Sequence, residues 1–248
     1  MIVLKSKSEL ELMRVAGSIT AQALLVGGEL VKPGITTAQI DKAINRFIKS
    51  QNAIPSFLGY GGFPASACIS VNDEVIHGIP GKRVLQEGDI VSIDVGALYK
   101  GFHGDSAATF AVGRISPEAT SLMEATKAGL YKGIAAAVVN NRVGDVSFAV
   151  QSHIEPLGYG IVRSFVGHGV GREMHESPEV PNFGNPGRGA RLLAGMVIAI
   201  EPMINLGTGN VKTEADGWTI RTMDGRLSAH FEHTVAITDN GPVILTQP

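Results

Sequence analysis

Two predicted helices followed by a run of short strands occur twice along this chain, and this order restricts the folds that are open to it. In the first round, Ser6 begins a capping box, so we expect a helix that extends to about Leu25 and ends at the glycine pair 27–28. Thr36 begins the second helix, because apolar residues then recur at helical spacing. Residues 56–110 change to short strands and glycine-rich turns.

The second round has the same order of elements. It begins at Ser116, an N-cap residue that is followed by a proline at the first helical position. We expect this helix to extend to about Val139. Asp145 is then predicted to cap another helix, which ends near Ile154. Strands and glycine-rich loops fill the rest of the chain.

The repeated order predicts an internal duplication in an α+β protein. The two halves, about residues 1–110 and 111–248, would share one curved antiparallel sheet. Coincidence is the alternative, because helix-then-strand runs are common. No linker-like or low-complexity stretch divides the halves, so we predict a single domain over residues 1–248, long enough to bury a substantial core.

The composition indicates an ordinary globular protein, since 44% of the residues are apolar and 18% are charged. The formal net charge of −2 argues against a nucleic-acid or membrane-surface partner. No run of about 18 apolar residues occurs, so we expect no membrane-spanning helix. Cys68 is the only cysteine and the N-terminus does not read as a secretory signal, so we expect a cytoplasmic protein without disulfides.

Four strand-like segments each carry one acidic residue among mostly small neighbours. Asp94, for example, shares its face of the strand with Ser92 and Gly96. One interpretation is that these are the solvent-facing sides of half-buried strands. Small neighbours suit a crowded concave interior better, and there several carboxylates would need cations to offset their repulsion and desolvation. The four acidic residues are Asp94, Asp105, Glu201 and Glu232.

A fifth candidate ligand and a hairpin sharpen the metal hypothesis. With a turn expected between Leu98 and Gly104, a hairpin can place Asp94 and Asp105 side by side. His168 lies between glycines that leave space around its ring, although a plain glycine turn is the alternative. Four carboxylates and one histidine suit Mn, Fe(II), Co or Zn. Two divalent ions about 3.5–4 Å apart would balance the charge and activate water.

In these contexts the chain resembles the type 1 methionine aminopeptidases, because all five candidate ligands occur in the order found in that family. The resemblance covers nearly the whole chain. Each matching segment alone would be weak, but the joint pattern is specific. The segments that carry the resemblance are residues 72–80, 92–96, 104–105, 167–171, 201–203 and 232–234.

The resemblance implies the pseudo-symmetric pita-bread fold, a curved antiparallel sheet with helices on its outer face. It also implies two divalent metal ions, which could be Co, Mn, Fe or Zn. Asp94 would bind the second metal, and His168 and Glu201 the first. Asp105 and Glu232 would bridge the two ions. Hydrolysis in the family uses a metal-activated hydroxide, for which Glu201 would shuttle the proton.

The resemblance also implies the substrate, which is the N-terminal methionine of nascent proteins and peptides whose second residue is small. His77 and His175 would hydrogen-bond the peptide and steady the tetrahedral oxyanion. An aromatic-rich pocket would hold the methionine side chain, although the residues of the aromatic loop 59–63 taken alone fit a core at least as well. The pocket residues would be Tyr60, Phe63, Cys68 and Trp218.

Some features depart from the family pattern or concern partners. Met174 stands where bacterial relatives often have a phenylalanine, which leaves the shape of the pocket open. The chain begins almost directly at the catalytic domain, so we expect neither an N-terminal extension nor the helical insertion of the type 2 enzymes. We expect a monomer with no membrane or sequence-specific nucleic-acid partner. Support for a ribosome contact is thin, because the loop from Gly207 to Asp216 has only Lys212 as a cation.

Three other classes of protein are alternatives. An Xaa-Pro peptidase of the same fold would usually carry an additional N-terminal domain. A binding module that had lost catalysis would typically have lost metal ligands as well. The segment Gly104-Asp105-Ser106 resembles the nucleophile segment of chymotrypsin-like proteases, but Ala107 follows in place of a glycine. Methionine release with and without a chelator would separate these classes.

Overall fold

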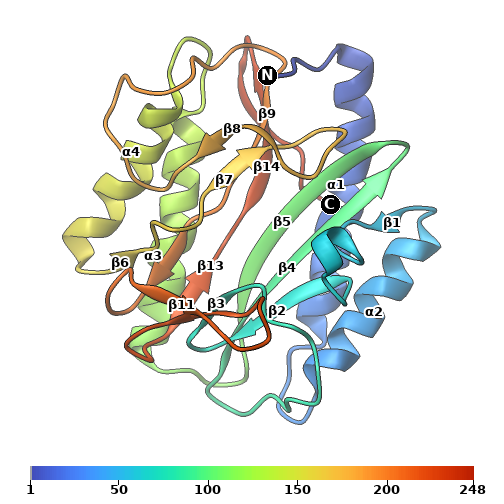
Figure 1. Ribbon diagram of the computed structural model, residues 1–248, viewed down its shortest axis with the longest axis vertical. Helices are drawn as coiled ribbons and strands as arrows, with labels where there is room; N and C mark the ends of the chain where they lie inside the picture. The colour runs from blue at the N-terminus through green and yellow to red at the C-terminus, as the bar shows by residue number, and fades with distance from the viewer. Residues whose placement is uncertain (1) are drawn as a thin grey trace.

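Helices flank a set of antiparallel strands in the computed structural model, which describes residues 2–248 (Figure 1). The helices are α1 (Lys7–Glu29), α2 (Thr37–Ser50), α3 (Pro117–Ala136) and α4 (Val143–Ile154), with short 3₁₀ turns at η1 (Tyr60–Gly62) and η2 (Glu155–Leu157). The first set of strands is β1 (Ile54–Pro55), β2 (Ala67–Val71), β3 (Glu74–Ile76), β4 (Ile90–Tyr99) and β5 (Phe102–Ala111). The second set is β6 (Gly160–Ile161), β7 (Gly167–Gly169), β8 (Glu176–Val180), β9 (Val197–Ile200), β10 (Met203–Asn205), β11 (Val211–Thr213), β12 (Ile220–Thr222), β13 (Ser228–His230), β14 (His233–Thr238) and β15 (Gly241–Ile244).

Each pair of helices covers the strands of its own half, so the expected α+β architecture is confirmed (Figure 1). In the first half, α1 packs against β4 and β5, and the isoleucines of the amphipathic helix α2 join the apolar face of β4 in one core. In the second half, α3 and α4 pack on each other and bury a separate apolar core against the strands. The strands of the two halves meet between the helix pairs, on the side of the strands that the helices do not cover. A functional site can form there.

The strands form four hydrogen-bonded sheets over residues 2–248. The two largest are a four-stranded sheet around β4 and a five-stranded sheet of order β15-β14-β9-β7-β8. All the observed strand pairs are antiparallel, as expected. The sheet that contains β5 is separate from those of β13 and β14, because β5 and the β13–β14 segment lie next to each other without forming a regular ladder.

Side chains bridge this seam between β5 and the β13–β14 segment. The Thr234 hydroxyl accepts a hydrogen bond from the Asp105 N–H at 3.0 Å and donates one to the Asp105 carbonyl at 2.7 Å. The Thr109 hydroxyl does the same for the backbone of His230, at 2.9 Å for each contact. One direct bond joins the two segments, from the Glu232 N–H to the Ala107 carbonyl at 2.9 Å. Hydroxyl groups therefore satisfy backbone groups that a regular ladder would otherwise have paired.

The predicted start of each helix in the first half is confirmed, but the predicted end of α1 is wrong. Ser6 and Thr36 are N-cap residues with complete capping boxes. The helix α1, however, continues through the glycine pair 27–28 to Glu29. A side chain at Gly28 would collide with the ring of Phe110, so this glycine allows close packing on β5 and does not end the helix.

Two smaller predictions concern the cap of α4 and the β4–β5 turn. The N-cap of α4 is Arg142, because Asp145 lies at the third helical position, where its carboxylate accepts the Arg142 N–H at 2.6 Å. The β4–β5 hairpin turns at Lys100 and Gly101, and the strands extend to Tyr99 and from Phe102. Both turn residues have positive φ, 46° and 84°, which suits the tight two-residue turns of hairpins. The turn therefore lies inside the segment from Leu98 to Gly104, as expected, and uses only its two central residues.

One helix, α1, is long and apolar enough to cross a membrane by length and composition, although no such segment was expected. Half of its apolar window is buried inside the fold. Its glycine and alanine face lies against β5, where Gly17 and Gly104 bring the two backbones together. This packing is that of a core helix in a folded domain.

We expect the free energy of unfolding to fall by about 1–3 kcal/mol in Thr234→Val, because the Asp105 N–H and carbonyl at the seam would lose their partner in a buried place. Denaturant unfolding monitored by circular dichroism measures this change. Thr213→Val is the matched control, because Thr213 is exposed on β11 and should change stability by less than about 0.5 kcal/mol. Equal effects of the two substitutions would contradict a role for the hydroxyl at the seam.

Candidate metal centre and substrate pocket

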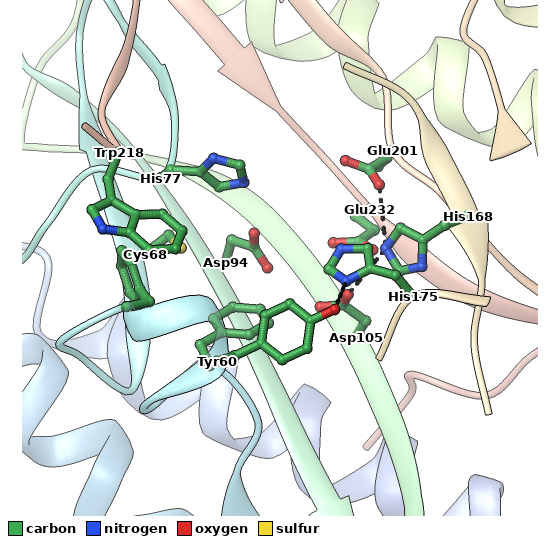
Figure 2. A pocket seen from close by; sticks show the side chains of 12 residues that line it. Tyr60, Cys68, His77, Asp94, Asp105, His168, His175, Glu201, Trp218 and Glu232 are labelled. Atoms are coloured by element: carbon green, nitrogen blue, oxygen red, sulfur yellow. Dashed lines mark hydrogen bonds and ion pairs between the residues drawn. The ribbon is translucent and has the colours of Figure 1, made fainter. Parts of the chain in front are cut away.

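The two acidic residues of the first half lie on the β4–β5 hairpin and face one cavity (Figure 2). In the observed register Asp94 pairs with Ala107, and Asp105 pairs with Gly96. The two acids are therefore diagonal neighbours on the same face, not a directly opposed pair. A side chain at Gly96 would meet Ser56 at 2.8 Å and Phe57 at 3.0 Å. There is therefore no room for a side chain at Gly96, which explains why a small residue shares this face with Asp94.

The second half brings three further side chains to the same cavity across the seam (Figure 2). His168 lies at the centre of β7, Glu201 follows β9 directly, and Glu232 lies between β13 and β14. Side chains at the glycines on either side of His168 would collide with carbonyl groups of neighbouring strands. The alternating glycines therefore allow close backbone approach, as predicted, and this brings the His168 ring into the cavity.

His168 lies close to carboxylates from both halves. Its Nε2 atom is 3.6 Å from an oxygen of Asp105 and 3.6 Å from an oxygen of Glu201. Ligand atoms of Asp105, His168 and Glu232 all lie within 4.8 Å of one another. The other ring nitrogen, Nδ1, is 2.8 Å from the Gly169 carbonyl, which can only accept a hydrogen bond. Nδ1 therefore carries the proton, and Nε2 presents its lone pair to the cavity.

The four carboxyl groups are destabilised as anions in the protein alone. Burial raises the pKa of Asp94 to about 7. Burial, reinforced by the charge of neighbouring acids, raises the pKa of Asp105, Glu201 and Glu232 well above their usual range. Three carboxylate oxygens of this cluster are buried without a hydrogen-bond partner among residues 2–248; they belong to Asp94, Asp105 and Glu232. Buried oxygens that lack partners and point into one cavity are suited to bind cations.

The donor set therefore fits divalent metal ions. Oxygen atoms from four carboxylates and one imidazole nitrogen, with no thiolate among these five residues, match the ligand preferences of Mn, Fe(II), Co and Zn. His168 has a metal-free pKa lowered to about 4, chiefly by burial and then by His175, so its ring is neutral at pH 7 and able to ligate.

Two further histidines, His77 and His175, line the same cavity (Figure 2). His175 is exposed, its ring centroid is 4.1 Å from that of His168, and its Nδ1 is 2.8 Å from the Tyr60 hydroxyl. His77 follows β3 with a positive φ of 58°. Burial, followed by the nearby charge of His175, lowers the pKa of His77 to about 4, and burial lowers that of His175. Both rings are thus neutral at pH 7 and able to donate a hydrogen bond.

The predicted pocket residues surround the open side of the same cavity, which has a volume of about 180 Å³. Phe63 and Trp218 pack edge to face with centroids 5.2 Å apart. Burial raises the pKa of the Cys68 thiol well above its usual range, so this side chain acts as a small apolar group. Tyr60 lies at the rim, where it is 45% exposed. Met174 is buried in the cluster behind Phe63 and Cys68 and supports the pocket wall.

Two residues at the site were not predicted. Phe57 lines the cavity next to the metal cluster and carries no signal in the sequence beyond its proximity to the aromatic loop. His230 is buried, with its Nε2 3.7 Å from an oxygen of Glu201. Burial, and then the charge of His77, lowers the pKa of His230 to about 3, so it is neutral. Strand alternation already placed His230 on the face of Glu232, and that pattern was the available signal.

Known proteins share this architecture over the whole chain. The family model for metallopeptidase family M24 matches residues 11–239. Methionine aminopeptidase of Clostridium acetobutylicum is 57% identical over 247 residues, which cover 99% of each chain. Methionine aminopeptidase 1 of Bacillus subtilis is 51% identical over 247 residues and 100% of each chain.

Solved structures show the same relationship. The methionine aminopeptidase structure from Thermotoga maritima has a TM-score of 0.99 and 45% identity, with 100% of each chain covered. A prolidase structure from Pyrococcus furiosus has a TM-score of 0.79 at 24% identity and shares only the fold, over 99% of this chain and 66% of its own. The pita-bread fold expected from the sequence is confirmed.

We expect divalent metal binding at pH 6 to release protons, because a carboxyl group with a pKa near 7 is mostly protonated there and must ionise to bind a cation. Affinity should therefore rise as the pH increases from 6 to 8. Isothermal titration calorimetry with Mn²⁺ in buffers of different ionisation enthalpy measures the release. Asp94→Asn should reduce it, whereas the exposed control Asp239→Asn should not. Binding without proton release at pH 6 would contradict these raised pKa values.

Proposed function

Because the chain belongs to metallopeptidase family M24 and, within it, to the methionine aminopeptidases, we propose that it removes the N-terminal methionine from nascent proteins and peptides whose second residue is small. One observation carries this proposal: five ligand-type side chains from both halves and a set of aromatic side chains line the same cavity of about 180 Å³. An oxygen-rich ligand cluster supports metal-dependent hydrolysis. The adjoining apolar pocket suits a single side chain at the end of a peptide.

The ligand assignment that we propose divides the cluster between two ions. Asp94 would hold one ion, and His168 with Glu201 would hold the other. Asp105 and Glu232 would be shared by both ions. The support is geometric and electrostatic: three carboxylate oxygens lack partners, and four negative charges are balanced by two divalent cations. When bound, the ions supply Lewis-acid activation of water and of the scissile carbonyl. Cobalt, manganese, iron and zinc all suit this set.

Glu201 is the residue that we assign to proton transfer. Its carboxylate lines the cavity beside the other four candidate ligands, within reach of a water held there. It can therefore take the proton of the attacking water and deliver it to the leaving amine. His168 and His230 approach different oxygens of the Glu201 carboxylate, at 3.6 Å and 3.7 Å.

His175 and His77 are assigned to the substrate peptide. The Tyr60 hydroxyl lies 2.8 Å from His175 Nδ1, and if it donates there, Nε2 carries the proton and faces the cavity. A neutral N–H donor aimed at the carbonyl oxygen stabilises the charge that develops in the transition state. His77 lies on the far side of the pocket, 6.4 Å from Trp218 between centroids, where it can hold the peptide backbone.

We place the enzyme in the cytoplasm as a monomer that acts on nascent chains. The single free cysteine and the packing of α1 in the core support a protein that folds without disulfides or a membrane. Contact with the ribosome is part of this proposal only as an encounter with its substrate.

We expect a peptide panel to separate the candidate activities. Met-Ala-Ser should be cleaved readily, because alanine at the second position leaves room beside the metal cluster and His77. Leu-Ala-Ser should be cleaved about 10–200-fold less efficiently, since only shape distinguishes the two side chains. Met-Lys-Ser should hardly be cleaved. Measuring kcat/KM for each peptide, with a chelator-treated sample as control, tests the proposal. Cleavage of Xaa-Pro peptides without a methionine requirement would assign the chain to the prolidase branch of the fold.

We expect His175→Ala to lower kcat by about 10²–10³-fold, because its hydrogen bond forms mainly in the transition state. Metal affinity should stay within about threefold of the wild type, which titration with Mn²⁺ measures. Tyr60→Phe is the companion variant, since it removes only the hydroxyl next to Nδ1. A His175→Ala protein that had lost a cation would show that His175 is a metal ligand, contrary to the assignment.

A further inference from the structure

A buried lysine lies before the first helix, at a point that the proposed function does not use. Lys5 is 7% exposed, and its Nζ is 2.6 Å from an Oε2 oxygen of Glu176, whose side chain is 11% exposed. The backbone N–H of Lys5 donates to the Gly195 carbonyl at 2.7 Å. A buried lysine is rare unless it is paired, so this contact is a specific feature of the fold.

The partner carboxylate organises the loop between β7 and β8, residues 170–175. The second oxygen of Glu176, Oε1, accepts the backbone N–H of Arg172 at 2.9 Å and that of Glu173 at 3.3 Å. The loop is also closed by the Gly171 N–H, which donates to the Glu173 carbonyl at 3.1 Å. A side chain at Gly171 would collide with the Glu176 carboxylate and lie 2.7 Å from Lys5 Cε. The loop is therefore folded tightly around the ion pair.

This loop connects two residues of the active site. The loop begins at residue 170, two positions after His168. The backbone of Glu176 pairs with Gly169, which is next to His168 in the sequence. The second end of the loop is His175, the direct neighbour of Glu176 in the sequence. The His175 side chain is exposed and has one hydrogen-bond partner among the described residues, the Tyr60 hydroxyl. The place of its ring is thus set largely by the backbone on which it stands.

We propose that Lys5 is a positioning residue for the reaction, which acts through Glu176 to hold the loop 170–175 and the His175 ring over the metal cluster. This inference rests on the proposed function of His175. Without the ammonium group, a buried carboxylate would lose its counter-ion and turn toward water, and the N–H groups of Arg172 and Glu173 would lose their acceptor. A displacement of about 1 Å at His175 is enough to cost a catalytic hydrogen bond.

A second ion pair on the same loop has a different character. Arg172 Nη2 is 3.1 Å from Glu9 Oε1, but the two side chains are 64% and 30% exposed. Exposed pairs of this kind contribute little. Glu9→Gln would weaken this pair and keep an acceptor for the capping box of α1. It serves as a control for loss of a charge near the loop.

The test compares Lys5→Met with the same substitution at the exposed Lys7. We expect Lys5→Met to lower kcat on Met-Ala-Ser by about 10–100-fold, with KM and Mn²⁺ affinity nearly unchanged. Lys7→Met and Glu9→Gln should match the wild type. Lys5→Met/Glu176→Gln should recover part of the loss, because it removes both buried charges and keeps an acceptor for the loop amides. In a His175→Ala background, Lys5→Met should cause no further loss of kcat.

Hydrogen exchange of the segment 170–176, measured by mass spectrometry, is the readout that does not depend on activity. We expect exchange there to be faster in Lys5→Met than in Lys7→Met. If Lys5→Met does not fold, kcat and hydrogen exchange of the segment 170–176 are compared between Lys5→Met/Glu176→Gln and Glu176→Gln.

Normal kcat and normal exchange in Lys5→Met would overturn the positioning role and leave the proposed function intact. Equal losses of kcat with and without His175 would also overturn it, because Lys5 would then act elsewhere. Failure of the wild type to cleave Met-Ala-Ser would instead refute the proposed function.

Discussion

Four carboxyl groups buried in one cavity are the constraint on which the rest of this structure depends. Burial raises the pKa of each group, and the acids raise one another further. A chain would not keep such a cluster for stability, since an unpaired buried charge costs far more than it contributes. Divalent cations would balance the ionised cluster, in keeping with the metallopeptidase family to which the chain belongs. Small residues around the acids leave space for four carboxyl groups in one cavity. The histidines that line the same cavity are neutral, so they add no charge of their own.

The site also depends on how the two halves are joined. Asp94 and Asp105 come from the first half, and His168, Glu201 and Glu232 come from the second. Neither half alone has enough ligands to hold two ions. The hydroxyl group of Thr234, in the second half, hydrogen-bonds both the N–H and the carbonyl of Asp105, in the first half. The second half therefore helps to position a candidate ligand of the first. We propose that the halves arose by duplication, which the repeated order of helices and strands supports.

Much of this could be predicted from the sequence, because local patterns control the elements concerned. Capping boxes at Ser6 and Thr36 determine where two helices begin, and strand alternation determines which face each acid occupies. The end of α1 was missed because glycine usually stops a helix, whereas here the ring of Phe110 requires it. That requirement is a contact between distant segments and leaves no local trace.

The division of the strands into four sheets and the burial of Lys5 were missed for the same reason. A hydroxyl that replaces a ladder hydrogen bond looks, in a sequence, like any threonine on a strand. Lys5 is one of several lysines near the N-terminus, and its burial arises only when the segment before α1 meets Glu176, far along the chain. Strand alternation could indicate which acidic side chains share a face, but it could not indicate which buried side chains meet from distant segments.

We propose that five side chains from the two halves hold a pair of divalent ions. Anomalous X-ray diffraction from crystals grown with Mn²⁺, collected near the manganese absorption edge, tests this proposal directly. We expect two peaks about 3.5–4 Å apart in the cavity. Asp105 and Glu232 should contact both peaks, Asp94 one of them, and His168 with Glu201 the other. A single fully occupied peak at saturating Mn²⁺, or two peaks that share neither Asp105 nor Glu232, would contradict it.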